Sequence, residues 1–192
     1  MLQRPKGTVD LLGEELARFA QLETLLHQTL KCAGYQELRP PHLEVTELFA
    51  RGVGEDTDIV SKEMFTIQRG ERSFTLRPEG TAGIVRAFIS NGWQQHLPLK
   101  LWYTGPMFRY ERPQKGRQRQ FHQAGIEVLG RHDVATDVEV LALAWQFLGK
   151  LPLKGSYTLQ INSLGDMASR VRYRDKLISN LEPHKARLSA DS

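Results

Sequence analysis

The chain has 192 residues, of which 40 % are hydrophobic and 25 % charged, and it carries a net charge of +4. These values are typical of one globular domain with a hydrophobic core, and they exclude a disordered or fibrous chain. No apolar run approaches the roughly 20 residues that span a bilayer. Met1 to Pro5 lacks the apolar core of a secretory signal. The single cysteine, Cys32, falls in a helical pattern, so we expect a buried thiol, no membrane contact and a cytoplasmic location.

The first half of the chain is predicted to combine helices with short extended segments. Leucines and Phe19 recur at three- and four-residue steps, which predicts one long amphipathic helix that ends before Gly34. Pro40 and Pro41 interrupt the extended segment that follows. The predicted elements are, in order, the helix Glu14–Ala33, the extended segment Tyr35–Leu43, the helix Glu44–Arg51, the strands Glu63–Gln68 and Ser73–Arg77, and the helix Thr81–Ser90.

The second half is predicted to contain two long strands around a basic loop, followed by helices. Thr136 and Glu139 have the spacing of a capping box, and Gly149 predicts the end of that helix. The predicted elements are the strand Lys100–Tyr110, the loop Arg112–Gln120, the strand Phe121–Leu129, the helix Thr136–Gly149, the strand Tyr157–Ile161 and the helix Asp166–Leu181. Hairpins mixed with single helices predict an α+β fold with a largely antiparallel sheet flanked by helices.

Side-chain alternation in the two long strands separates an apolar face from a polar one. We expect the apolar face to pack on the core, with His122 as a core histidine; it carries His122, Ala124, Ile126 and Val128. If the strands pair as a hairpin, the opposite face carries a polar row around small residues: Arg109, Glu111, Phe121, Gln123 and Glu127. This row predicts a floor for a polar ligand.

The basic loop lies at one end of that floor. Arginine guanidinium groups make bidentate, charge-assisted hydrogen bonds to phosphate oxygens, so this loop suits a polyphosphate. Phe121 could stack on an adenine. The chain has no Walker-type glycine loop, so side chains would have to hold nucleotide phosphates. The alternative interpretation is a solvated turn with an ordinary Arg–Glu pair between the strands.

The segment Arg77-Pro78-Glu79-Gly80-Thr81 joins a predicted strand to a predicted helix and has two interpretations. An acid and a hydroxyl at this place can simply initiate the helix, because they complement its free N–H groups and its dipole. Alternatively, Glu79 binds the ammonium group of a ligand. The residues alone favour helix initiation. His42, His96, His122 and Cys32 show no spacing typical of metal ligands.

At this point the residues resemble a known family. Phe108 to Arg117, followed by Arg119 to Gln123, resembles motif 2 of class II aminoacyl-tRNA synthetases, in the form found in histidyl-tRNA synthetases, and Gly34 to Glu44 resembles motif 1. Three further stretches follow the same family's pattern: Gly54–Val60, Thr75–Thr81 and Asn162–Gly165. The likeness covers nearly the whole chain, in order, and identifies it as resembling the N-terminal part of the family's catalytic domain.

The resemblance implies a class II catalytic-core fold, a homodimer formed through Gly34–Glu44, and a two-step reaction. Histidine is first activated with ATP, with Mg²⁺ inferred from the ATP chemistry, and the acyl group then passes to tRNA(His). The residues implied for ATP are Arg109, Glu111, Arg117 and Phe121. Those implied for histidine are Glu79, Thr81, Arg109, Gln123 and Glu127. Arg109 would bridge the α-phosphate and the carboxylate and stabilise charge in the transition state.

The sequence departs from the family pattern in its extent. Motif 3, a later catalytic arginine and the anticodon-binding domain are not found in it, so we expect residues 1–192 to be inactive alone. Two alternatives stay open. One is the regulatory paralogue of the histidine-biosynthetic ATP phosphoribosyltransferase, which tends to lose the motif 2 residues that are present here. The other is a non-catalytic RNA-binding module that stacks bases on Tyr110 or Phe121.

Overall fold

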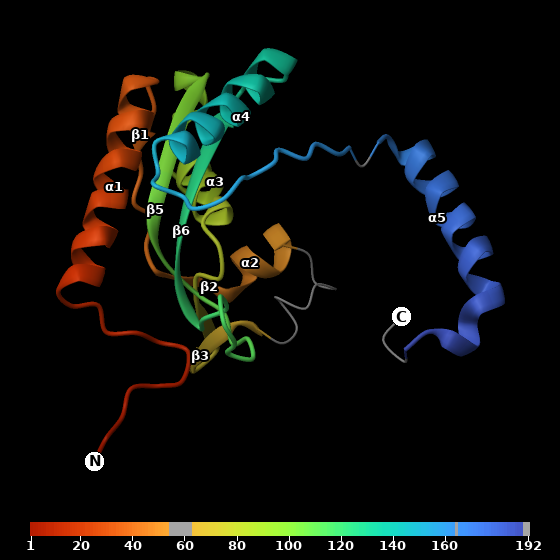
Figure 1. Cartoon of the computed structure of the whole chain (residues 1–192), viewed down its shortest axis with the longest axis horizontal. Coiled ribbons are helices and arrows are strands. Elements are labelled where there is room, and N and C mark those ends of the chain that lie inside the picture. Colours follow the sequence, from red (N-terminus) through yellow and green to blue (C-terminus); the bar gives the residue numbers. More distant parts are fainter. Residues whose placement is uncertain (54–62, 164, 190–192) are drawn as a thin grey trace. The chain divides into compact units, whose positions relative to one another are not determined.

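The computed structural model describes residues 1–53, 63–163 and 165–189 and divides into two compact units, Met1–Pro152 and Leu153–Ser192 (Figure 1). Every strand in these described ranges lies in the first unit. The predicted motif segment Gly54–Val60 lies outside the described residues. No helix in the described part of the chain is long and apolar enough to cross a membrane.

The long N-terminal helix, α1 (Glu14–Cys32), confirms the predicted amphipathic helix. Leu26, Thr29 and Leu30 are its buried residues, and the chain leaves the helix through Gly34 at a φ of 80°. Cys32 is exposed, so the prediction of a buried thiol is wrong. The reason is helical geometry: a residue two positions after Leu30 is rotated by about 200° and points away from the core.

Sheet A has the order β1-β5-β6. The strands β5 (Leu99–Phe108) and β6 (Gln120–Leu129) pair antiparallel from Leu99 opposite Leu129 to Phe108 opposite Gln120, which confirms the predicted hairpin. β1 (Gln36–Glu37) pairs with β5 in parallel at the edge.

Sheet B has the order β2-β4-β3 and is antiparallel throughout. Its strands are β2 (Leu43–Val45), β3 (Phe65–Arg69) and β4 (Arg72–Leu76). The helix α2 (Thr46–Val53) begins two residues later than predicted, because Glu44 and Val45 pair with Thr75 and Phe74 of β4. The helix α3 (Thr81–Ser90) and the short 3₁₀ helix η2 (Trp93–His96) complete this part.

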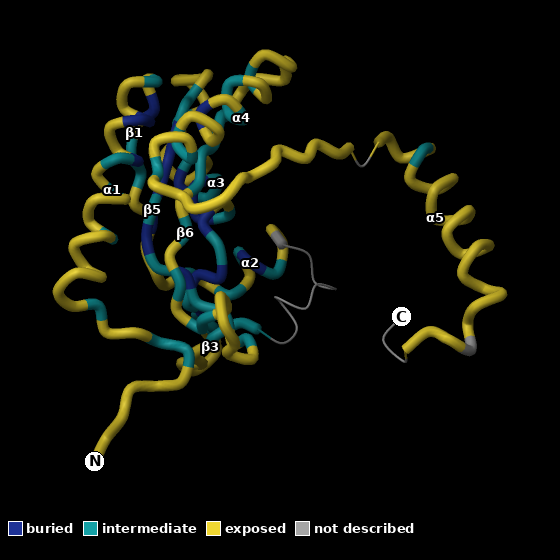
Figure 2. Tube along the Cα trace, viewed as in Figure 1, coloured by how far each residue is buried: buried dark blue, intermediate teal, exposed yellow. Residues whose placement is uncertain are grey.

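Two small cores lie on opposite faces of the hairpin. On one face Trp102 packs with Leu26 and Leu30 of α1, Leu143 of α4, and Tyr35 from the segment between α1 and β1. On the other face Ile84 of α3 packs on Leu101, Tyr103 and Met107. Figure 2 shows the buried residues gathered along β5 between the helices. Because successive side chains of β5 alternate between the two faces, this single strand contributes to both cores.

The helix α4 (Val134–Gly149) ends where predicted but begins two residues earlier. The predicted capping box is wrong: Asp133 is the N-cap, and its carboxylate accepts the backbone N–H of Thr136 at 2.9 Å. Glu139 instead binds Lys100 Nζ at 2.7 Å and the hydroxyl of Tyr35 at 2.9 Å. A carboxylate that tertiary partners hold in this way is not free to turn back to the start of its own helix.

The second unit contains α5 (Met167–Leu181), capped by Asp166, and the 3₁₀ helix η3 (Glu182–Arg187). The strand predicted at Tyr157–Ile161 does not form; these residues are extended without strand pairing. Leu159 and Ile161 are exposed. Alternation alone does not make a strand, since the backbone groups also need a neighbouring strand to pair with.

Candidate active site

The face of the β5–β6 hairpin that α3 partly covers is named here the floor. Register places Phe121 opposite Met107, Gln123 opposite Gly105, and Glu127 opposite Leu101. Phe121, Gln123 and Glu127 therefore share one face, as predicted. The floor is less polar than predicted, however, because Leu101, Tyr103 and Met107 are buried on the same side under Ile84. The polar row runs along the edge of a small apolar core.

The opposite face, named here the reverse face, is apolar only along part of its length. Ile126 and Val128 pack against the core formed with α1 and α4. His122 is exposed, so its prediction as a core histidine is wrong. Its ring contacts Phe19 edge-on at 4.4 Å, and partial desolvation lowers the pKa of His122. It lines a groove of about 560 Å³ between α1 and the hairpin, with a mixed polar and apolar lining that includes Glu23 and His27 of α1.

Arg109 follows the last residue of β5 and continues the hairpin, since its N–H donates to the carbonyl of Arg119 at 2.9 Å. Its side chain is fixed from two sides. Nε donates to the carbonyl of Pro78 at 2.9 Å, and the guanidinium lies over the ring of Phe121, 5.2 Å from its centroid. A guanidinium has five N–H donors. Apart from Nε, the donors lie on the two terminal nitrogens, of which NH1 is 3.9 Å from Glu111, and they can turn to an anion at the end of the floor.

Glu111 lies between two of the predicted cations. Its Oε2 is 3.4 Å from NH1 of Arg117, and its Oε1 is 3.9 Å from NH1 of Arg109. The Arg–Glu pair of the alternative interpretation is therefore present. One carboxylate shared by two guanidiniums still leaves a positive potential, which suits a phosphate. The side chain of Arg117 is 65 % exposed and can therefore reorient toward a ligand.

Glu79 initiates α3, as the residues alone favoured. Its carboxylate accepts the N–H groups of Thr81 at 2.6 Å and Ala82 at 2.9 Å. The hydroxyl of Thr81 donates to Glu127 Oε1 at 2.7 Å and links the start of α3 to the floor. Burial raises the pKa of Glu127, and the nearby charge of Glu79 raises it further. Thr81 thus bonds to both carboxylates, through its N–H to Glu79 and through its hydroxyl to Glu127. Two carboxylates this close create a negative potential, which suits an ammonium or imidazolium group.

The side chain of Gln123 is a second feature that indicates a ligand site. Its Oε1 is buried and has no hydrogen-bond partner within the described ranges. A buried acceptor left without a donor costs about 1–3 kcal/mol. A ligand N–H reaching the floor next to Glu127 would satisfy this oxygen.

Tyr103 is not among the predicted site residues, yet it lies on the floor and is 2 % exposed. Its ring occupies space left by Gly80 and Gly125: a Cβ on Gly125 would lie 2.4 Å from the Tyr103 hydroxyl. Burial raises the pKa of Tyr103, and its hydroxyl bonds to Thr81. The available signal was its position in β5, which shares the parity of the polar row.

Arg77 was noted in the sequence but given no role. It is 3 % exposed, and its Nε and NH1 donate to the carbonyls of Pro106 and Pro40, both at 2.9 Å. Its carbonyl accepts the N–H of Phe108 at 2.9 Å. Arg77 thus fastens the segment that carries Pro78 and Glu79 to the end of β5, where Arg109 begins.

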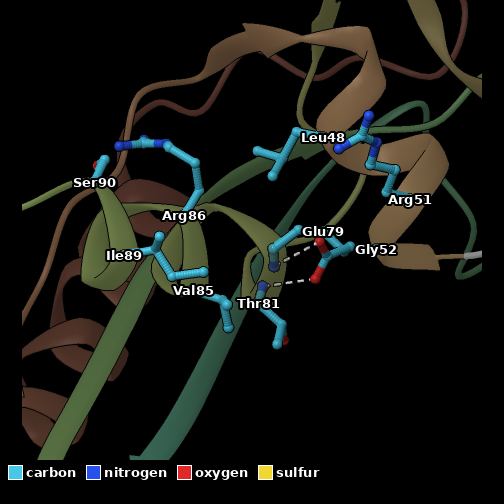
Figure 3. A pocket seen from close by; sticks show the side chains of 10 residues that line it. Leu48, Arg51, Gly52, Glu79, Thr81, Val85, Arg86, Ile89 and Ser90 are labelled. Atoms are coloured by element: carbon cyan, nitrogen blue, oxygen red, sulfur yellow. Dashed lines mark hydrogen bonds between the residues drawn. The ribbon is translucent and has the colours of Figure 1, made fainter. Parts of the chain in front are cut away.

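A pocket of about 540 Å³ lies between α2 and α3, beside the floor rather than on it (Figure 3). Glu79 and Thr81 reach it, whereas Arg109, Gln123 and Glu127 do not line it. Most of its wall is apolar, with Leu48, Val85 and Ile89 in Figure 3 and two arginines at the rim, Arg51 and Arg86. Of the predicted site residues, Glu79 and Thr81 border this pocket, whereas the others lie on the floor.

Comparisons with known proteins agree with these motifs. A family model described as histidyl-tRNA synthetase matches residues 7–168. A histidine–tRNA ligase of Prochlorococcus marinus is 53 % identical over the whole chain, which spans 45 % of that relative. The structure of apo S. aureus histidyl-tRNA synthetase matches all of the chain, and 45 % of its own, with a TM-score of 0.72 and 36 % identity. A Bacillus halodurans protein titled ATP phosphoribosyltransferase regulatory subunit/histidyl-tRNA synthetase matches 78 % of the chain, and 38 % of its own, with a TM-score of 0.67 and 27 % identity.

Proposed function

Because this chain belongs to the histidyl-tRNA synthetase family, we propose that it supplies the floor on which ATP and histidine react and from which the histidyl group passes to tRNA(His). The chain spans 45 % of the length of curated relatives. Residues that the rest of such a ligase contributes to the site are not part of this sequence. The support from the structure is the polar row of the floor, with a fixed arginine at one end and an unsatisfied acceptor, Gln123 Oε1, further along.

Arg109 is proposed to stabilise the first step. In that step the histidine carboxylate attacks the α-phosphorus of ATP, a P–O bond forms, and pyrophosphate leaves. Charge grows on the α-phosphate oxygens as the bond forms, so a donor already held in place is most effective there. The bond from Nε to Pro78 and the contact with Phe121 hold Arg109 in place before any ligand binds.

The remaining nucleotide contacts are proposed for Glu111, Arg117 and Phe121. Arg117 is exposed and shares Glu111 with Arg109, so it can exchange this carboxylate for a phosphate oxygen. Phe121 presents its ring at the base of the basic loop, where an adenine can stack. Glu79, Glu127 and Glu111 bond to an N–H, an O–H and a guanidinium respectively, and none of the three is assigned to a Mg²⁺ ion.

Histidine is proposed to lie between the start of α3 and β6. Its amino group would meet Glu79 and Thr81, and its imidazole would donate to Gln123 Oε1 and Glu127. An amino acid whose side chain lacks an N–H would leave the acceptors of Gln123 and Glu127 unpaired. Sites built in this way reject such analogues by roughly 10⁴-fold or more.

Two further properties are proposed for the whole protein: a cytoplasmic location and a homodimer formed through Gly34–Glu44. β1 lies at the edge of sheet A, and Leu43 is exposed in β2. An open strand edge next to exposed apolar side chains is a surface that a second copy can cover.

A non-hydrolysable histidyl-adenylate analogue tests the proposed floor on this chain. We expect the analogue to raise the melting temperature of the chain, because a ligand that binds only the folded state stabilises it. Arg109→Ala should remove most of the shift. The matched control Arg131→Ala should keep the shift, since Arg131 pairs with Asp133 before α4. An equal shift with the alanyl analogue, or none with the histidyl analogue, would contradict the proposal.

A further inference from the structure

Tyr103 joins the floor to the start of α3. Register places it opposite Gly125, which precedes Glu127 on the same face of β6. Its hydroxyl also reaches Gly80, since a Cβ on Gly80 would lie 2.7 Å from the hydroxyl oxygen. The ring therefore occupies space that two glycines leave open, and its hydroxyl ends beside Thr81, the residue that follows Gly80 in the chain.

A chain of two hydrogen bonds runs from this hydroxyl to Glu127. Thr81 donates its hydroxyl proton to Glu127 Oε1 at 2.7 Å, and the hydroxyl of Tyr103 bonds to Thr81. Because a hydroxyl has a single proton to donate, Tyr103 is the donor of the second bond and Thr81 is its acceptor. Burial raises the pKa of Tyr103, so its hydroxyl keeps the proton that this bond needs.

Thr81, the middle member of the chain, depends on its partners for its orientation. It is exposed, so packing does not fix its hydroxyl. Tyr103, in contrast, is 2 % exposed and packs with Ile84 of α3 and with Met107. A bond from this fixed donor turns the Thr81 hydroxyl toward Glu127. It also strengthens the bond that follows, by about 10–30 % in chains of this kind.

The surroundings of Glu127 make the bond from Thr81 important. Burial raises the pKa of Glu127, the hydrogen bond from Thr81 lowers it, and the charge of Glu79 raises it. Glu79 is held close by, because it accepts the N–H of Thr81 at the start of α3 (Figure 3). The charge of Arg77 acts on Tyr103 at the other end of the chain. The hydroxyl of Thr81 thus favours the ionised carboxylate, which is the form that binds a ligand N–H most strongly.

We propose that Tyr103 is a positioning residue for histidine: through Thr81 it holds the carboxylate of Glu127 in one orientation, with Oε1 bonded to Thr81 and Oε2 left for the imidazole N–H. This inference rests on the proposed function and adds to it a residue that acts through another. A carboxylate that is oriented before the ligand arrives loses less conformational entropy on binding, which raises affinity. We therefore expect Tyr103 to influence the affinity for histidine and not that for ATP.

The first test is the titration of Glu127 in Tyr103→Phe, which removes the hydroxyl and keeps the packed ring. Carbon NMR of isotope-labelled glutamates in this chain follows each carboxyl group against pH, and Glu127→Gln identifies the signal of Glu127. We expect the pKa of Glu127 to be higher in Tyr103→Phe than in the parent, because a weaker bond from Thr81 favours the ionised form less.

Tyr35→Phe is the matched control. It also removes a buried hydroxyl that bonds to a glutamate, Glu139 at 2.9 Å, but Tyr35 belongs to the core on the reverse face. Tyr35→Phe should therefore leave the pKa of Glu127 as it is in the parent.

The second test is affinity, measured on a ligase of full family length that carries these residues. Tyr103→Phe should weaken histidine binding about 2- to 10-fold, the contribution of one ordinary hydrogen bond. ATP affinity and kcat should change little, so the effect should appear in the KM for histidine. Tyr35→Phe should keep the parent's affinity for both ligands.

A double variant shows whether Tyr103 acts through Thr81. Thr81→Val removes the hydroxyl in the middle of the chain and keeps the backbone N–H that Glu79 accepts. In this background Tyr103→Phe should have little further effect on the pKa of Glu127, so the two changes should not be additive.

Four results would overturn the proposal: a parent-like Glu127 pKa in Tyr103→Phe, parent-like histidine affinity in that variant, an equal pKa change in Tyr35→Phe, or additive effects in the double variant. A failure of the proposed function looks different. The pKa of Glu127 would then rise in Tyr103→Phe as expected, while the histidyl-adenylate analogue would not raise the melting temperature of the parent. That outcome would support the orientation of Glu127 by Tyr103 and contradict the proposed floor.

Discussion

The two faces of the β5–β6 hairpin are built from alternate residues of the same strands, yet they serve different ends. On the reverse face Trp102 is 2 % exposed and packs with Leu26, Leu30 and Leu143. On the floor Gln123 has a buried oxygen without a partner, and Glu127 is a half-buried carboxylate with a raised pKa. Burial of apolar surface stabilises the first arrangement, whereas the second lowers the stability of the fold and is retained where a ligand can use it.

The strongest test of this comparison is Trp102→Ala. Removing a large buried aromatic side chain leaves a cavity, and we expect the free energy of unfolding to fall by about 3–5 kcal/mol. Urea denaturation, followed through the unfolding transition of the first unit, would measure this loss of free energy. Gln123→Ala on the floor is the control and should change stability by less than about 1 kcal/mol. Similar losses in the two variants would mean that both faces are ordinary core.

Arg109→Ala should have the opposite effect to Trp102→Ala, with a large loss of activity and a small loss of stability. In a ligase of full family length that carries these residues, we expect histidine-dependent pyrophosphate exchange to fall roughly 10²–10³-fold, the usual loss for one transition-state donor. The melting temperature should fall much less than in Trp102→Ala, since the described contacts of this side chain are a hydrogen bond to Pro78, the ring of Phe121 and a 3.9 Å pair with Glu111. An exchange rate near that of the parent would remove Arg109 from the reaction.

Gly125→Ala tests how tightly the floor is packed. Its Cβ would lie 2.4 Å from the Tyr103 hydroxyl, so we expect a loss of about 1–3 kcal/mol from overpacking. The same change in a Tyr103→Ala background should cost much less, because the clash is gone. A double-mutant cycle measures this coupling. Additive losses would show that Tyr103 does not fill the space beside Gly125.

Glu127→Gln has the smallest expected effect. It should raise the stability of the fold and lower the affinity for histidine. Burial raises the pKa of Glu127 above its unfolded value, so the folded state holds the proton more tightly. Its contribution to stability is therefore present below the unfolded pKa of about 4.3 and is lost as pH rises through the folded pKa. Near neutral pH we expect Glu127→Gln to raise stability by up to about 1 kcal/mol, and this gain should vanish at low pH.

Histidine affinity should fall in the same variant, because a neutral amide attracts an imidazole less than a carboxylate does. Calorimetry with histidine on a full-length ligase, with ATP affinity as the internal control, would measure it. Reduced ATP affinity with unchanged histidine affinity would sink the assignment of Glu127.

The helices and the hairpin followed from local patterns. The period of β5 and β6 placed Phe121, Gln123 and Glu127 on one face before any partner was known, and the register agrees. The roles proposed for these side chains came with the family resemblance and stay predictions. The sequence assigned no role to Tyr103 or Arg77, because their contacts, with Thr81 and with Pro40 and Pro106, join segments far apart in the sequence.

What the sequence determined by itself is the periodic part of this protein: α1, the β5–β6 hairpin with its two faces, and the basic loop between the strands. These depend on the order of neighbouring side chains, which the sequence contains in full. Only the tertiary structure decided that Cys32 and His122 are exposed, that Asp133 rather than Thr136 caps α4, and that Tyr157–Ile161 forms no strand. Each of these depends on which surface meets which, and burial and strand pairing exist only once distant segments are in contact.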